Sequence, residues 1–206
     1  MEILHPDLPK IIEAIGYIGI FTIVFAESGL LIGIFLPGDS LLFTAGFLSS
    51  AGMFNLPTLS VGCFIAAVLG DNVGYAFGKK VGPAIFKRKN SFWFHKKHLE
   101  RAQRFYEKHG GKTIVLARFL PVVRTFAPIL AGAGAMNYRK FLFYNILGGF
   151  SWAVGLTTLG HYLGSFIPDV DKYLLPIVLL IILLSLLPTV IHVLREHTLA
   201  KPTRGN

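Results

Sequence analysis

Charged residues are scarce in this chain of 206 residues, because Asp, Glu, Lys and Arg together make up 15% and apolar residues make up 53%. A typical soluble domain is about 25% charged, so the composition excludes an ordinary water-exposed surface. Residues 174–194 carry no Asp, Glu, Lys or Arg, and about 20 apolar residues are needed to cross a bilayer. The sequence therefore predicts an integral membrane protein.

Several functional signatures are also lacking. Cys63 is the only cysteine, so no intramolecular disulfide can form. No P-loop, zinc signature or nucleophile elbow occurs, which argues against an ATP-driven pump in a single chain. His95 and His98 lie among Phe92, Trp93, Lys96 and Lys97, so we expect them to belong to an amphipathic surface and not to bind a metal. We expect no enzyme activity, no catalytic residue and no cofactor.

The positive charge is concentrated in one segment. Of the 20 Lys and Arg residues, 11 lie between Lys79 and Lys112. Short loops rich in Lys and Arg remain in the cytoplasm, so 79–112 is predicted to be a cytoplasmic amphipathic loop that lies on anionic headgroups. The basic tail, 195–206, and the N-terminus are placed on the same side. This distribution indicates membrane topology, and no nucleic-acid partner is expected.

The expected fold class is an all-α membrane protein that forms a single membrane domain over residues 1–206. Four crossing helices are predicted at 11–30, 57–78, 141–165 and 173–194. Two further apolar segments, 31–53 and 113–136, contain helix breakers and are predicted to be re-entrant hairpins. The breakers are Pro37 and Gly38 in the first segment, and Pro121 and Pro128 in the second. Irregular backbone at membrane depth must be buried in protein or line a wet cavity, so the hairpins should face each other.

An internal repeat relates residues 11–78 to residues 113–165. Phe35-Leu36-Pro37 recurs as Phe119-Leu120-Pro121, Ala45-Gly46 as Ala131-Gly132, Met53 as Met136, and Gly78-x-x-x-Gly82 as Gly160-x-x-x-Gly164. The first hairpin would enter from outside and the second from the cytoplasm, so the halves would have opposite topology, as in transporters built from inverted repeats. Coincidence among Gly, Pro and Phe is the alternative.

Five charged residues lie within the predicted membrane zone: Glu27, Asp39, Asp71, Arg118 and Arg124. Each costs about 2.5–3.5 kcal/mol at the bilayer centre, so the unpaired set would cost more than about 12 kcal/mol. These residues must therefore be paired, hydrated or neutralised, and they are functional candidates by default. A purely structural ion-pair network is the alternative.

The acids and the arginines suggest different roles. Two acids in one poorly solvated cavity cannot both ionise cheaply, so Glu27 and Asp39 are predicted to carry a proton. Arg118 and Arg124 flank Pro121 and offer planar forks that match phosphate oxygens, so they are predicted to bind an anion. Alternatively, Arg118 extends to the cytoplasmic surface. Six residues are predicted to support the site: Asp71, Pro37, Gly38, Pro121, Asn145 and Trp152.

These residues carry a family resemblance. Glu27, Phe35-Leu36-Pro37-Gly38-Asp39, Gly70-Asp71 and Arg118-Phe119-Leu120-Pro121-x-x-Arg124, followed by Ala131-Gly132, resemble the DedA family of bacterial membrane proteins, also called the VTT or SNARE-associated family. The resemblance covers roughly residues 15–165. It implies that the acid pair and the arginine pair are needed for function, and that re-entrant hairpins belong to the fold. It also implies links to envelope maintenance, undecaprenyl phosphate recycling and phospholipid movement.

The resulting hypothesis is a multi-pass protein of the bacterial inner membrane that uses protons to move an anionic lipid, with undecaprenyl phosphate as the leading candidate. An uncoupled scramblase for phospholipids such as phosphatidylethanolamine is the first alternative. A lipid-phosphate enzyme using His161 and a purely structural membrane protein are weaker alternatives. Anionic lipids, protons and membrane lipids are the expected partners, and homo-oligomerisation is left open.

Overall fold

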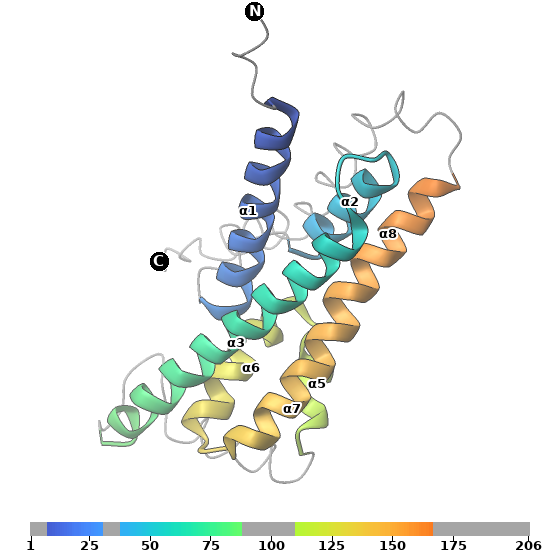
Figure 1. The fold of residues 1–206 in the computed structure, drawn as a ribbon. Coiled ribbons are helices and arrows are strands. Elements are labelled where there is room, and N and C mark those ends of the chain that lie inside the picture. The colour runs from blue at the N-terminus through green and yellow to red at the C-terminus, as the bar shows by residue number, and fades with distance from the viewer. Residues whose placement is uncertain (1–7, 31–37, 88–109, 167–206) are drawn as a thin grey trace, which may run out of the picture.

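The computed structural model describes residues 8–30, 38–87 and 110–166 (Figure 1). Within these ranges every regular element is helical, as the predicted fold class requires. The elements are α1 (Leu8–Gly29), α2 (Gly38–Ser50), α3 (Leu56–Lys87), α5 (Lys112–Ala117), α6 (Pro121–Ala133), α7 (Tyr138–Gly149), the π-helical turn η2 (Phe150–Val154) and α8 (Gly155–Ser165). The predicted helix 173–194, the tail 195–206 and His95, His98 and Pro37 lie outside the described residues.

Two helices are long and apolar enough to cross a bilayer. One is Leu56–Gly82, with 27 residues, and the other is Tyr138–Ser165, with 28 residues, which joins α7, η2 and α8. At 1.5 Å per residue each is about 40 Å long, against a hydrocarbon core of about 30 Å. They contain the predicted crossings 57–78 and 141–165. Helix α3 continues to Lys87, so the first part of the predicted basic loop is helical.

The two predicted hairpin segments contain short helices. In the first, α2 begins at Gly38, next to the predicted break. In the second, α5 ends at Ala117 and α6 begins at Pro121, which occupies the first turn where proline is tolerated. The expectation that Pro128 also breaks the helix is wrong, because α6 continues through it. Pro128 faces Gly74 of α3, where a Cβ atom would lie 3.4 Å from Pro128 Cβ, so α6 packs closely on α3 at this point. The re-entrant course of both segments stays a prediction.

Helices α2 and α6 end in the same way. Gly52 and Ala135 follow these helices with φ angles of 79° and 55°. The next residue, Met53 or Met136, donates its backbone N–H to the carbonyl group five residues earlier, at 3.2 and 3.0 Å. These are Schellman-type endings, which use a left-handed residue to satisfy the last carbonyl groups of a helix. The methionines are the pair that the sequence repeat had matched.

An asparagine begins the long helix after each of these endings. Asn55 accepts a hydrogen bond from the Thr58 backbone N–H at 3.1 Å, just before α3. Asn137 accepts from the N–H groups of Arg139 and Lys140, at 3.0 and 3.3 Å, and caps α7. Asparagine is among the best N-cap residues because its side chain satisfies free N–H groups of the first turn. The two halves therefore share a short helix, a left-handed turn, an asparagine cap and a long helix.

Each short helix packs on the long helix of the other half. A Cβ atom on Gly46 of α2 would overlap the carbonyl group of Thr157 in α8, and one on Gly160 would overlap that of Phe43. The equivalent crossing of α6 on α3 brings Gly132 against Tyr75 and Gly78 against Ile129. Adding 86 to the residue numbers in α2 and subtracting 82 from those in α8 gives the residue numbers of the contacts between α6 and α3. The long helices α3 and α7–α8 run in opposite directions (Figure 1), as the predicted inverted repeat requires, and the inverted repeat itself stays a prediction.

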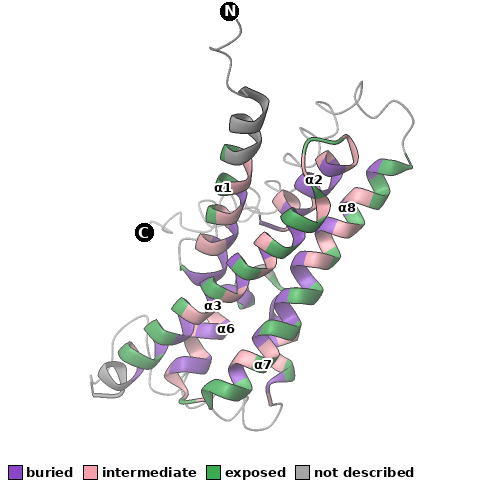
Figure 2. Ribbon diagram, in the orientation of Figure 1, coloured by how far each residue is buried: buried purple, intermediate pink, exposed green. Residues whose placement is uncertain are grey.

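The outward faces of the long helices are apolar, and Figure 2 shows exposed residues along the outer sides of α3 and α8. On α3, large exposed apolar side chains recur every four residues: Val61, Ile65, Leu69, Val73 and Phe77. A spacing of four residues places side chains on one helix face. Such a long exposed apolar stripe is unsuitable for water and suits contact with lipid tails.

The glycine crossings generate a first prediction. Gly160→Ala should lower the melting temperature of the detergent-purified protein, because the added Cβ must push α8 away from the Phe43 carbonyl group, at a cost of about 1–3 kcal/mol. Gly155→Ala is the matched control in the same helix, because a Cβ there has no neighbour within 4 Å. Equal melting temperatures for the two variants would contradict the close crossing of α2 and α8.

Candidate functional site

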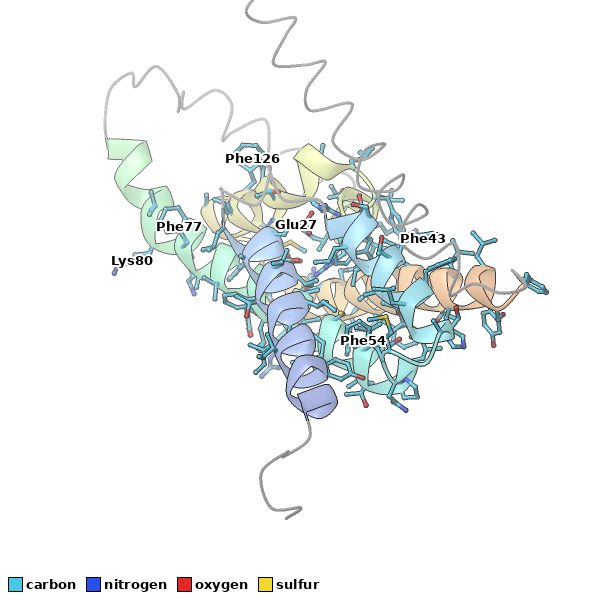
Figure 3. All side chains as sticks on the ribbon, turned by 90° about the horizontal axis from the view of Figure 1, so that it is seen from above. Glu27, Phe43, Phe54, Phe77, Lys80 and Phe126 are labelled. Carbon is cyan, nitrogen blue, oxygen red and sulfur yellow. The ribbon has the colours of Figure 1, made fainter. Side chains whose placement is uncertain are left out.

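Arg124 of α6 joins the two acids that the sequence had paired. Its Nη1 atom lies 2.6 Å from Asp39 Oδ1, and its Nη2 atom donates to Glu27 Oε1. The arginine side chain is 8% exposed. Figure 3 shows Glu27 near the middle of the helix bundle, viewed from above. Three helices, α1, α2 and α6, therefore meet at one buried arginine, which brings Glu27 and Asp39 together as predicted.

Glu27 is held as a buried anchor. It lies in the last turn of α1, where the partial negative charge of the helix end disfavours a carboxylate, so a nearby cation is needed. In addition to Arg124, the backbone N–H of Gly38 donates to Glu27 Oε1 at 3.1 Å. A Cβ atom on Gly38 would overlap the Glu27 carboxylate. Glycine at position 38 therefore lets the start of α2 approach the end of α1.

Asp39 occupies a different environment. It lies in the first turn of α2, where the helix dipole favours a negative charge. Its side chain is 47% exposed, whereas that of Glu27 is 1% exposed. The Asp39 Oδ1 atom accepts from Arg124 Nη1 and also from the indole Nε1–H of Trp152, at 2.7 Å. The two acids thus share one arginine, but only Asp39 is open to its surroundings.

Arg118 belongs to a second, fully buried cluster. Its Nη2 atom lies 2.5 Å from Asp71 Oδ2, and each side chain is 4% exposed. The same Nη2 atom donates to the side-chain oxygen of Asn145, and Asn145 donates to the Val68 carbonyl group at 3.1 Å. The alternative in which Arg118 extends to the cytoplasmic surface is therefore wrong, because Asp71 and Asn145 hold the guanidinium inside the bundle.

Trp152 lies between the two clusters. The centroid of its ring is 5.0 Å from the Arg124 guanidinium carbon and 6.0 Å from that of Arg118, within the range of cation–π attraction. The tryptophan is buried within η2, and π-helical turns are often found at functional sites. The arginines predicted to form one anion site instead have separate acidic partners and are linked through one indole ring.

Two residues beside Arg118 were missed by the sequence analysis. A Cβ atom on Gly148 would lie 3.0 Å from Arg118 Cδ, and one on Gly149 would lie 3.5 Å from Arg118 Nη2. The absence of side chains at these positions lets α5 and Arg118, which directly follows it, pack against the end of α7. The adjacent glycines in an apolar helix were the available signal, because small residues permit close helix packing in membranes.

The remaining candidates have smaller roles in the geometry. Pro121 is the first residue of α6, three residues before Arg124. His161, which the enzyme alternative required, has its Nδ1 atom 2.8 Å from Ser49 Oγ. The Ser49 hydroxyl also donates to the Gly46 carbonyl group at 2.6 Å, so this pair links α2 to α8 at the glycine crossing.

The electrostatics of the site follow from its composition. All five predicted membrane charges are paired with one another, three acids against two arginines, so the formal charge with every group ionised is −3 + 2 = −1. Among the described residues, Glu27 Oε2, Arg118 Nε and Arg124 Nε are buried without a hydrogen-bond partner. A buried site with excess negative charge favours uptake of a proton, and an arginine with a displaceable partner can accept an external anion.

Comparison with known proteins identifies the family. The family model described as the VTT domain matches residues 36–162. The chain belongs to this family, the DedA family. It is 44% identical to protein DedA of Escherichia coli (strain K12) over 205 residues, which cover 96% of this chain and 93% of that protein. No solved structure matches the chain significantly.

Other relatives agree on the membrane location. The inner membrane protein YqjA of Escherichia coli (strain K12) is 37% identical over 179 residues, covering 80% of this chain and 79% of the relative. An uncharacterized membrane protein of Mycobacterium leprae is 46% identical over 169 residues, covering 82% and 75%. Together with the two helices of spanning length, these names identify this DedA-family chain as a membrane protein.

The buried Arg118 cluster generates a second prediction. Arg118→Gln should lower the melting temperature strongly, because removing one partner of a buried ion pair costs about 3–5 kcal/mol. The double variant Arg118→Gln with Asp71→Asn should recover much of this loss, since neither partner then leaves an unpaired charge. Lys80→Gln, at an exposed position of α3, is the control that should not change stability. If the decrease in melting temperature of the double variant equalled the sum of the decreases for Arg118→Gln and Asp71→Asn alone, the two residues would not act as a pair.

Proposed function

We propose that this protein is a proton-motive-force-linked transporter, not an enzyme, that moves undecaprenyl phosphate from the outer to the inner leaflet of the bacterial inner membrane. The observation that supports this proposal is that the buried Arg124 forms ion pairs with two acids, the buried Glu27 and the half-exposed Asp39. In the proposed topology both termini and the loop 79–112 are cytoplasmic.

The geometry provides the two activities that such a transporter needs. The guanidinium of Arg124 can bind phosphate oxygens through two parallel N–H groups. Glu27 and Asp39 lie on the same guanidinium, so a lipid phosphate that approaches Arg124 meets their negative charge. Protonation of one acid removes this repulsion and compensates for the charge of the phosphate. Proton binding and phosphate binding are thereby linked at one side chain.

The membrane potential explains why coupling phosphate movement to proton movement would be useful. A phosphate monoester carries about −1.5 to −2 charges at neutral pH. Moving one elementary charge against 100 mV costs about 2.3 kcal/mol, so inward movement of the phosphate costs roughly 3.5–4.6 kcal/mol per 100 mV. One or two accompanying protons would cancel most of this cost. A transporter that returns such a lipid to the cytoplasmic side therefore benefits from acids next to its anion-binding arginine.

The third prediction concerns the substrate. Purified protein should bind undecaprenyl phosphate more tightly than uncharged undecaprenol or phosphatidylethanolamine, and Arg124→Gln should abolish this preference because it removes the charged fork. Binding can be measured by native mass spectrometry or by the shift in melting temperature on adding lipid. Equal binding of all three lipids would instead support an uncoupled scramblase with a non-selective lipid path.

The fourth prediction concerns coupling. In liposomes containing the protein, an imposed pH gradient should accelerate movement of undecaprenyl phosphate between leaflets, and the effect should disappear on adding a protonophore. Glu27→Gln should weaken the response, because the neutral amide removes negative charge that favours proton uptake beside Arg124. Transport that is indifferent to the gradient would disprove coupling. Release of inorganic phosphate from the lipid would indicate an enzyme.

A further inference from the structure

Asp39 and Glu27 hold the same arginine in different ways. Glu27 is sealed, and its Oε1 atom accepts from both Arg124 and the Gly38 backbone. Asp39 is about half exposed, and its Oδ1 atom accepts from Arg124 and Trp152. Of the two acids that bind Arg124, Asp39 is the exposed one, so we take its position as the point where an anion from outside the bundle approaches Arg124 Nη1.

The donors around Asp39 Oδ1 are arranged as in an anion-binding site. Two donors from separate elements, Arg124 Nη1 of α6 and Trp152 Nε1 of η2, converge on this single oxygen at 2.6 and 2.7 Å. A phosphate oxygen has the same preference as a carboxylate oxygen for short, charge-assisted hydrogen bonds from such donors. The Trp152 N–H is a donor only, and it has to find an acceptor when buried.

We propose that the Asp39 carboxylate occupies the phosphate-binding site and competes with the lipid phosphate for Arg124 and Trp152. In the lipid-bound protein, the Trp152 Nε1–H then donates a hydrogen bond to the phosphate. This inference rests on the proposed function and deepens it. A phosphate monoester displaces the Asp39 carboxylate and takes over both hydrogen bonds, while Glu27 remains in place as the anchor of Arg124. Protonation of Asp39 favours the exchange, because a neutral acid holds the guanidinium less strongly.

The proposal predicts that removing an acid strengthens anion binding. We would measure the affinity of the full-length protein, in an uncharged detergent, for dodecyl phosphate, with undecaprenyl phosphate and inorganic phosphate as further probes and dodecanol as the uncharged control. Asp39→Asn and Asp39→Ala should each bind dodecyl phosphate more tightly than wild type, by roughly tenfold or more, the lower end of the effect of a close charge pair. Both variants should lose the response of lipid transport to a pH gradient.

Glu27→Gln is the matched control, because Glu27 bonds to the same arginine but does not lie at the opening. It should gain much less affinity than the Asp39 variants and should lose more thermal stability, since its carboxylate is buried between Arg124 and Gly38. An equal gain in the two variants would overturn the proposal, because the effect would then reflect net charge and not occupancy.

Trp152→Phe tests the second donor while keeping an aromatic ring beside both arginines. In the Asp39→Asn background, Trp152→Phe should reduce affinity for dodecyl phosphate by several-fold, which a purely structural role for the ring would not do. Weaker or unchanged binding in both Asp39 variants, with wild type still binding, would overturn this inference and leave the proposed function standing. Failure of wild type and all variants to bind any phosphate probe, with melting temperatures intact, would overturn both.

Discussion

A charge that is removed from water inside a membrane bundle must find a partner of opposite sign, and this requirement organises the centre of the protein. Arg124 joins α6 to acids of α1 and α2, and Arg118, which follows α5, pairs with an acid of α3, so ion pairs as well as packing hold these helices together in two clusters. In a low-dielectric interior these attractions are strong, and an unpaired member is correspondingly costly. The rest of the fold must therefore hold the helices close enough together for these ion pairs to form.

Glycine meets that need at the contacts between helices. Gly38 admits the carboxylate of Glu27, the crossings at Gly46 and Gly132 bring backbones into direct contact, and Gly148 accommodates Arg118. Close approach of this kind favours van der Waals contact between helices, which replaces the hydrophobic effect as a source of association in a bilayer. The same positions leave no room for a larger side chain, so the polar centre and the small residues around it form one connected constraint.

Much of this arrangement could be predicted from the sequence, and the failures have physical causes. Charge scarcity predicted the membrane class, and Glu27 and Asp39 were predicted to share one cavity, but Arg124 was not identified as the partner of both. Spacing alone could not show that Arg118 turns toward Asp71, because side-chain direction depends on the break between α5 and α6. The location of Trp152 between the arginines depends on the π-helical turn, which has no clear sequence signature. The break expected at Pro128 did not occur, because a proline within an apolar sequence can stand inside a helix whose packing against a neighbour holds it together.

The matched halves of the fold carry unmatched charges. Under the offsets that relate the helix crossings, Asp39 corresponds to Thr125 and Asp71 corresponds to Ala153, so neither acid has a counterpart. A shape change that exchanged the roles of the two halves would therefore not lead to a state of equal energy, because only one half has carboxylates to solvate or bury. The two halves therefore match in shape but not in charge, so a conformational exchange between them would favour one of its two states.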